Sequence, residues 1–171
     1  MPQASQELLD TLNLAAAATV VEREFRLADF ARLVDRLATA DGVAVARMTL
    51  RTAGGVPAGE LEVCAETLLT CERCLRPMRR TLRSTSQLAF VESEDTPAPA
   101  DHEAIPGDPR RVNLAGLVED ELLLSLPLIA IHGKGDECIP LASQVSGGAG
   151  EGPSSQERRR PFAGLKELLK H

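Results

Sequence analysis

Residues 59–90 read GELEVCAETLLTCERCLRPMRRTLRSTSQLAF, and this stretch decides the fold. Apolar residues alternate with charged or polar residues both before and after its short cysteine-bearing turn. Before the turn, one face holds Leu61, Val63, Ala65, Thr67 and Leu69, and the other holds Glu60, Glu62 and Glu66. After the turn, one face holds Met78, Leu82, Leu88 and Phe90, and the other holds Arg79, Arg83 and Gln87. Alternation with a period of two predicts a pair of antiparallel strands that bury one face.

Further elements flank this predicted pair of strands. Residues 20–25 and 43–52 have the composition of strands. Apolar residues at helical spacing predict a helix over residues 27–37, and Asn113 can cap another helix over residues 114–126. The predicted fold class is therefore α+β, with an antiparallel β-sheet, open or closed into a barrel, and a few packed helices.

The chain divides by composition into four parts. Residues 1–18 carry no strong pattern, and we expect a loosely ordered N-terminal arm there. Residues 19–142 are expected to form a single α+β domain, which includes an acidic, proline-rich loop at 92–110. Residues 143–160 have the composition of a flexible linker, and residues 161–171 have the pattern of an amphipathic helix.

The composition restricts the classes of function. The 171 residues carry a formal net charge of −6 and include four Phe but no Trp or Tyr. Bulk binding of nucleic acid is disfavoured, because the field of the whole molecule repels phosphates and few rings are available to stack on bases. The sequence has no secretory signal pattern and no apolar run of membrane-spanning length. We therefore expect a cytoplasmic protein without membrane association, whose cysteines are reduced thiols or metal ligands.

The CERC motif is the sharpest local signal for a binding site. Cys71 and Cys74 are separated by two residues in a turn, a spacing that lets both sulfurs bind one zinc ion. One such pair is half a site, and the candidate second half is His132 with Cys138. The alternative is that the cysteines are ordinary reduced thiols and that His132 is an exposed loop residue. A redox role is a further alternative, although thioredoxin-like sites place the reactive cysteine at the start of a helix.

Arginine is concentrated in two segments that could contact a partner. The first cluster consists of Arg73, Arg76, Arg79, Arg80 and Arg83, and the second consists of Arg158, Arg159 and Arg160. Such clusters can bind RNA phosphates or an acidic protein surface. The alternative is a solvated face, since charged residues on an edge strand also protect a sheet against aggregation.

No familiar catalytic constellation is evident in the sequence. The adjacent acids Glu119, Asp120 and Glu121 fall within one turn of the predicted helix, where consecutive side chains fan outward instead of opposing one another across a cleft. We expect these acids to be exposed. P-loop, GxGxxG, GxSxG and HExxH motifs do not occur. We therefore expect a non-enzymatic protein that acts by binding and has no small-molecule substrate.

Taken in order, these features resemble the bacterial YceD family. The resemblance rests on the strand-rich residues 59–70, CERCLRP at 71–77, VEDEL at 118–122 leading into LPL at 126–128, His132 followed by Cys138, and PFAGL at 161–165. It implies a role in the synthesis, processing or stability of 23S rRNA, and hence in large-subunit assembly. Some relatives carry a cysteine at the position resembling His132, which implies that His132 and Cys138 are metal partners. This sequence lacks the second cysteine pair of those relatives.

Three hypotheses of function follow from these observations. The leading one is an accessory factor in ribosome biogenesis that contacts assembly components or rRNA through the arginine-rich strand and the C-terminal helix. The alternative is a zinc-stabilised structural or protein-interaction adaptor without a direct rRNA role, and the third is a thiol-redox protein. The negative charge and the scarcity of aromatic residues favour contact through protein, or a very local contact with RNA.

Overall fold

The computed structural model describes residues 8–133 and 138–140 of the chain. The chain divides into two compact units, residues 1–138 and residues 139–171. The predicted linker at 143–160 and the predicted helix at 161–171 lie outside the described residues. The predicted domain boundaries at residues 19 and 142 stay predictions.

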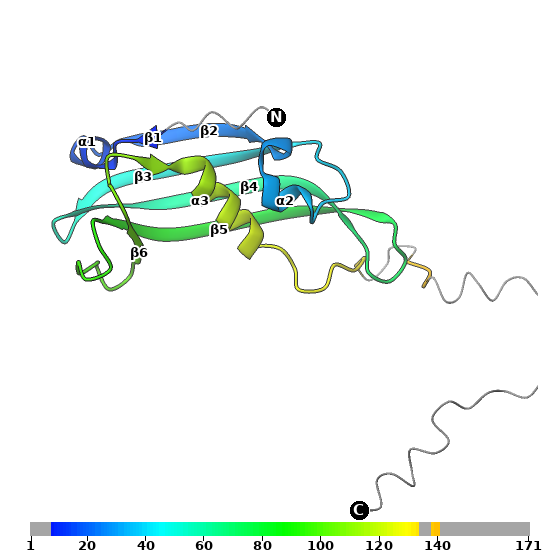
Figure 1. Ribbon diagram of the computed structural model, residues 1–171. Helices are drawn as coiled ribbons and strands as arrows, with labels where there is room; N and C mark the ends of the chain where they lie inside the picture. The colour runs from blue at the N-terminus through cyan, green and yellow to red at the C-terminus, as the bar shows by residue number, and fades with distance from the viewer. Residues whose placement is uncertain (1–7, 134–137, 141–171) are drawn as a thin grey trace, which may run out of the picture. The chain divides into compact units, whose positions relative to one another are not determined.

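The first unit is built on one five-stranded sheet (Figure 1). Its strands are β2 (Val20–Arg26), β3 (Val43–Ala53), β4 (Val56–Thr70), β5 (Pro77–Val91) and β6 (Glu103–Pro106), side by side in that order. All neighbouring pairs are antiparallel except β5 and β6, which are parallel. The sheet is open, with β2 and β6 outermost, so the α+β class is confirmed in its open form.

The β4–β5 hairpin is the longest pairing in the sheet, and its faces are those that the alternation predicts. The register runs from Ala58 opposite Ala89 to Thr70 opposite Pro77. The predicted apolar face is buried on both strands, with Leu61 on β4 and Leu82 on β5 almost fully covered. This burial fixes the register, because a shift of one residue would turn the apolar side chains to solvent.

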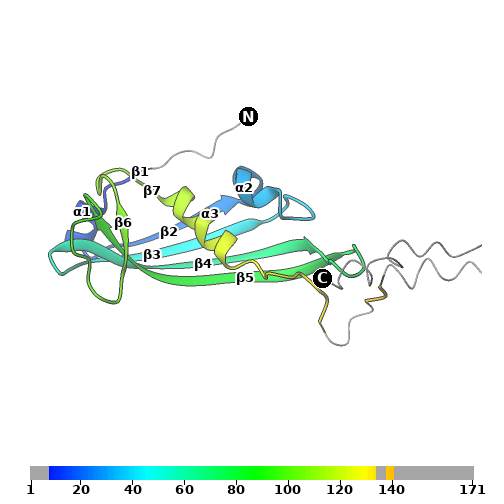
Figure 2. The same cartoon turned by 60° about the horizontal axis from the view of Figure 1, so that its bottom comes forward.

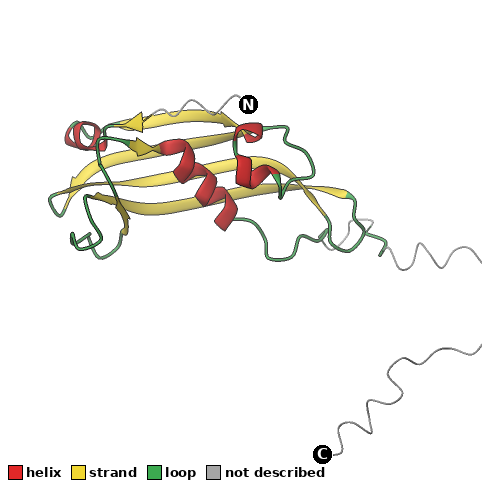
Figure 3. Cartoon of the chain, viewed as in Figure 1, coloured by secondary structure: helices red, strands yellow, loops and turns green. Residues whose placement is uncertain are grey.

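Helices cover one face of the sheet (Figure 3). The longest is α3 (Leu114–Leu124), which buries Leu114, Val118 and Leu122 in the same core as the inner face of the strands. The Asn113 side chain accepts a hydrogen bond from the backbone N–H of Gly116, so the predicted cap is confirmed. Pro127 follows shortly after the end of this helix.

The predicted helix over residues 27–37 is broken into two short turns. These are η1 (Leu27–Asp29), a 3₁₀ turn, and α2 (Ala31–Val34). The apolar positions are nevertheless the buried ones, as Leu27, Phe30 and Leu33 are all in the core. The spacing therefore identifies the face that packs but overestimates the length of the helix.

Residues 8–18 differ from the prediction of a loosely ordered arm. They form β1 (Leu8–Leu9) and α1 (Thr11–Ala16), and β1 pairs with β7 (Val112–Asn113). The Thr11 hydroxyl and backbone N–H both donate to the carbonyl of Pro109, at 2.6 and 2.9 Å. These partners are about a hundred residues away along the chain, so no local pattern signals them. Residues 1–7 lie outside the described residues.

The acidic segment 92–110 also contains more structure than a solvated loop. Its residues 103–106 form β6, where Ile105 lies opposite Phe90 of β5. β6 reaches only the last residues of β5, from Leu88 to Val91. In the described part of the chain, no helix is long and apolar enough to cross a membrane.

Candidate metal centre

The loop between β4 and β5, residues 71–76, is a tight turn that presents two thiols. The backbone N–H of Cys71 donates to the carbonyl of Arg76 at 3.0 Å, and the N–H of Leu75 donates to the carbonyl of Cys71 at 2.8 Å. Leu75 adopts a left-handed conformation with φ 56°. This conformation costs a residue other than glycine about 1–2 kcal/mol, so the surrounding contacts hold the turn in place.

A second segment, residues 125–133, runs from the end of α3 to this loop, and we call it the strap (Figure 1, yellow). The backbone N–H of Glu72 donates to the carbonyl of Ala130 at 2.8 Å and ties the strap to the loop. Two residues beyond that hydrogen bond, the strap presents His132 beside Cys74. Cys74 and His132 are 58 residues apart in sequence.

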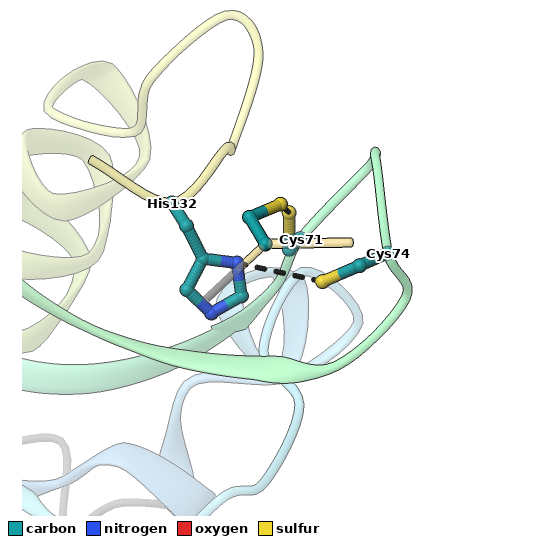
Figure 4. A group of neighbouring side chains, drawn as sticks. Cys71, Cys74 and His132 are labelled. Carbon is teal, nitrogen blue, oxygen red and sulfur yellow. Dashed lines mark hydrogen bonds between the residues drawn. The ribbon is translucent and has the colours of Figure 1, made fainter. Parts of the chain in front are cut away.

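The four predicted metal ligands meet at this junction. Cys74 Sγ lies 3.5 Å from His132 Nδ1 (Figure 4). Cys71 Sγ lies 3.8 Å from Cys138 Sγ. One ligand atom from each of the four residues lies within 4.8 Å of the others. Sulfurs bound about 2.3 Å from a tetrahedral zinc are about 3.8 Å apart, and a sulfur and an imidazole nitrogen are about 3.6 Å apart. These two separations therefore match the edges of a zinc tetrahedron.

The centre lies in a small core of its own. Cys71 and Cys74 are buried and pack with Leu69 and Met78, and Cys138 packs against this group. All these cysteines are free thiols, since the 3.8 Å between the sulfurs of Cys71 and Cys138 far exceeds a disulfide bond of about 2.05 Å. The burial shields the sulfurs from solvent, as expected for a structural metal site.

The electrostatics of the centre favour one thiolate and disfavour a second. Burial alone would raise the pKa of Cys71, but backbone hydrogen bonds from Cys74, His132 and Arg73, with the His132 side chain, lower this pKa to about 5. The pKa of Cys138 is raised by burial and by the neighbouring sulfurs of Cys71 and Cys74. Cys71 is thus a thiolate at neutral pH, the form that binds metals.

The local fold differs from that of a thioredoxin-like redox site. There, a helix N-terminus stabilises the reactive thiolate. Here, Cys71 and Cys74 lie in a hairpin loop that leads directly into β5, and backbone N–H groups of the loop and the strap stabilise the thiolate instead. The remaining cysteine, Cys64, lies in the middle of β4, opposite Val45 of β3 and Arg83 of β5.

The predicted arginine contacts are dispersed around the hairpin. Arg73, Arg76, Arg79, Arg80 and Arg83 are all exposed. Arg76, Arg79 and Arg80 line a hollow that also includes His132. Arg79 and Arg83 point to the open face of the sheet, whereas Arg80 lies on the side of Met78 and Leu82. Arg158, Arg159 and Arg160 lie outside the described residues.

The acids of α3 make contacts that the sequence does not predict. Glu119 accepts hydrogen bonds from the backbone N–H groups of Arg32 and Leu33, at 2.7 and 3.3 Å, and so caps α2. The Arg32 guanidinium binds both Glu119 and Asp120, at 2.8 and 2.7 Å. Glu121 is buried and accepts a hydrogen bond from the Ser84 hydroxyl. The expectation of exposed acids is therefore wrong for Glu121, and the partners of Glu119 are more than eighty residues away.

The comparison with known proteins addresses this same region. A family described as "Large ribosomal RNA subunit accumulation protein YceD" matches residues 59–169, which is more than half of the chain. The chain belongs to the YceD family. The YceD match begins at the β4–β5 hairpin and includes all four residues of the metal centre. A search of solved structures gave no match.

The lowered pKa of Cys71 predicts a pH dependence of stability in the metal-free, reduced protein. A thiol whose pKa falls from 9.0 to about 5 on folding stabilises the folded state at high pH, and this contribution is lost as the pH falls toward 5. We expect the free energy of unfolding to contain a component that rises between about pH 5 and pH 9 and that Cys71→Ser removes. Urea denaturation with chelator and reductant measures it.

Cys64→Ser is the matched control for this measurement, because Cys64 is not among the residues of the centre. For Cys64→Ser, the free energy of unfolding should rise with pH as steeply as it does for the wild-type protein. Equal slopes in the wild type and in Cys71→Ser would contradict the assignment of the low pKa to Cys71.

Proposed function

We propose that the chain is a non-enzymatic accessory factor that supports accumulation of 23S rRNA in the cytoplasm, and so assembly of the large ribosomal subunit. The family's own description, which names accumulation of the large ribosomal RNA, is the observation that carries this proposal. Three thiols and one imidazole converge in the structure, which supports a structural role for a bound metal in this function. The protein then acts as a scaffold that positions assembly components, and not as a catalyst.

We assign zinc to the centre as part of this proposal. Three sulfurs and one imidazole nitrogen make up a donor set that suits zinc well, and hard cations such as magnesium and calcium prefer oxygen. The set is also complete, because four protein ligands fill a tetrahedral shell and leave no position open for a substrate. A closed shell is typical of structural zinc, which supports a non-enzymatic role.

The centre joins two parts of the chain that no regular secondary structure holds together. The backbone hydrogen bond from Glu72 to Ala130 links the loop to the strap, and His132 adds contacts from the strap to Cys71 and Cys74. A zinc ion held by all four residues would bind the loop through Cys71 and Cys74, the strap through His132, and the chain beyond the strap through Cys138. The metal would thereby fix the shape of the surface at this end of the sheet.

A zinc-stabilised adaptor without a direct rRNA role is the alternative to this proposal. Both share the metal centre, so metal content does not separate them. Sedimentation does: the factor that we propose should travel with precursors of the large subunit in a sucrose gradient of cell lysate, and an unrelated adaptor should stay at the top.

We predict that the purified protein contains close to one zinc per chain. Cys71→Ser should lose most of this zinc and melt at a lower temperature, because the metal contributes its binding free energy to folding. Elemental analysis and thermal denaturation with and without a chelator measure the two effects. Cys64→Ser, with the same change of atom outside the centre, should retain both zinc and stability. A metal-free protein whose melting the chelator leaves unchanged would remove zinc from the account.

We further predict that cells lacking the gene accumulate less 23S rRNA relative to 16S rRNA. Wild-type protein and Cys64→Ser should restore the ratio, and Cys71→Ser should restore it poorly. Quantification of both rRNAs from total RNA measures this, with an immunoblot to compare protein levels. An unchanged ratio in the deletion strain would overturn the proposed function, whatever the zinc content.

A further inference from the structure

Most of one long edge of the sheet is open. β6 pairs only with residues Leu88–Val91 of β5. Within the described chain, the stretch of β5 from residue 77 to residue 87 therefore has a partner strand on one side only, which is β4. Figures 1 and 2 both show β6 beside one end of β5 and the rest of that edge uncovered. An edge of this length is a template for another strand.

The unpaired backbone groups on this edge belong to alternate residues. The hydrogen bond from Cys71 N–H to the Arg76 carbonyl shows that Arg76 turns its carbonyl toward β4. At the other end, the Val91 carbonyl accepts from Gly107 N–H, on the side away from β4. Backbone groups alternate in direction along an antiparallel strand. The odd-numbered residues of β5, including Arg79, Thr81 and Arg83, therefore direct their N–H and carbonyl groups outward.

The open edge is strongly basic. Arg79, Arg80 and Arg83 are exposed, and no carboxylate in the described part of the chain forms an ion pair with any of them. The whole chain, by contrast, carries a net charge of −6. The local charge favours an acidic ligand, and it disfavours a second copy of β5 on this edge, because arginine would face arginine.

An apolar wall runs beside one end of the edge. A hollow of about 310 Å³ is lined by Met78, Arg80, Pro127, Ile129, Ile131 and His132. Ile129 and Ile131 are exposed by 62% and 39% of their surfaces, although they are aliphatic. They belong to the strap, which the hydrogen bond from Glu72 to Ala130, between these two residues, holds beside the hairpin. Exposed aliphatic side chains next to a basic edge suit a peptide better than a nucleic acid.

We infer that the open edge of β5 binds an extended acidic segment of a partner protein by strand addition. The segment adds its backbone to the outward N–H and carbonyl groups of residues 79–87. Its acidic side chains meet Arg79, Arg80 and Arg83, and an apolar side chain enters the hollow beside Ile129 and Ile131. The inference rests on the proposed function, because it identifies as protein the class of assembly component that the scaffold holds.

The pattern of the segment follows from the geometry of a strand. Successive side chains of an added strand point to opposite faces of the sheet. On the open face they meet Arg79 and Arg83, which calls for acids. On the other face they meet the apolar wall of the strap, which favours an apolar residue, and Arg80, which favours an acid nearby. A sequence in which acidic and aliphatic residues alternate places its acids beside Arg79 and Arg83 and its aliphatic residues beside the wall of the strap.

The test uses the full-length, metal-containing protein and a labelled peptide with blocked ends, about eight residues of alternating glutamate and valine. Fluorescence anisotropy should detect saturable binding. Thr81→Pro removes one outward N–H and should weaken binding at least about tenfold, because proline is tolerated at an outward edge position but cannot donate. Thr81→Val is the matched control, since it loses the same hydroxyl bond to Glu66 but keeps the N–H, and it should bind within about twofold of the wild type.

A second pair of variants tests the charges independently of the backbone. Arg79→Glu with Arg80→Glu should weaken binding at least about tenfold, and Arg47→Glu with Arg51→Glu, a matched reversal on β3, should change it by less than about twofold. The absence of binding to the wild-type protein, or equal binding by Thr81→Pro and Thr81→Val, would overturn the inference. Two further results would also overturn it. One is that a labelled oligouridine RNA binds more tightly than the peptide and that Thr81→Pro does not change this binding. The other is that the free protein is a dimer which Thr81→Pro dissociates.

The outcome in cells separates this inference from the proposed function. If the deletion strain loses 23S rRNA and Thr81→Pro restores it fully, the open edge is dispensable and the inference fails, while the proposed function stands. If the deletion leaves 23S rRNA unchanged, the proposed function fails, regardless of peptide binding. Loss of rescue by Thr81→Pro together with rescue by Thr81→Val supports both.

Discussion

Three thiols and one imidazole converge at the end of the β4–β5 hairpin, where Cys71 and Cys74 are buried, and their sulfurs oppose ionisation of Cys138 when no cation is present. Backbone N–H groups hold Cys71 as a thiolate, with a pKa of about 5, and the sulfurs of Cys71 and Cys74 in turn oppose ionisation of Cys138. A divalent cation removes this opposition, because it stabilises all the thiolates together. Because these four residues come from the loop, the strap and the chain just beyond it, a shared cation would also hold those segments together.

The rest of the unit places these two segments where they can meet. The paired apolar faces of β4 and β5 fix the register, and the register sets the position of the six-residue loop between Thr70 and Pro77. On the helical layer, the Arg32 contacts to Glu119 and Asp120 join α2 to α3, and α3 leads into the strap. The centre therefore lies where the sheet layer and the helix layer both end. The open edge of β5 begins at the same point, so the four candidate ligands and the edge are neighbours on one end of the sheet.

The sequence predicts what depends on local pattern and misses what depends on distant partners. Period-two alternation identifies both faces of the hairpin, Asn113 marks the start of α3, and thiol and imidazole chemistry identifies all four members of the centre. The sequence does not reveal that residues 8–18 are structured, because the residue that holds Thr11 in place, Pro109, lies 98 residues away along the chain. The cap that Glu119 provides for α2 and the pairing of β6 with β5 are non-local in the same way. The hairpin arginines form one cluster in sequence, but strand geometry places Arg79 and Arg83 on one face of the sheet and Arg80 on the other.

X-ray absorption at the zinc edge of the purified, full-length protein tests the central claim most directly, because it reports the atoms bound to the metal. The account predicts a single shell of three sulfurs at about 2.3 Å and one nitrogen at about 2.0 Å, with the outer-shell features of an imidazole. Two sulfurs completed by oxygen would show that His132 and Cys138 do not join the cysteine pair. That result would contradict the claim that one ion holds the hairpin loop and the strap together.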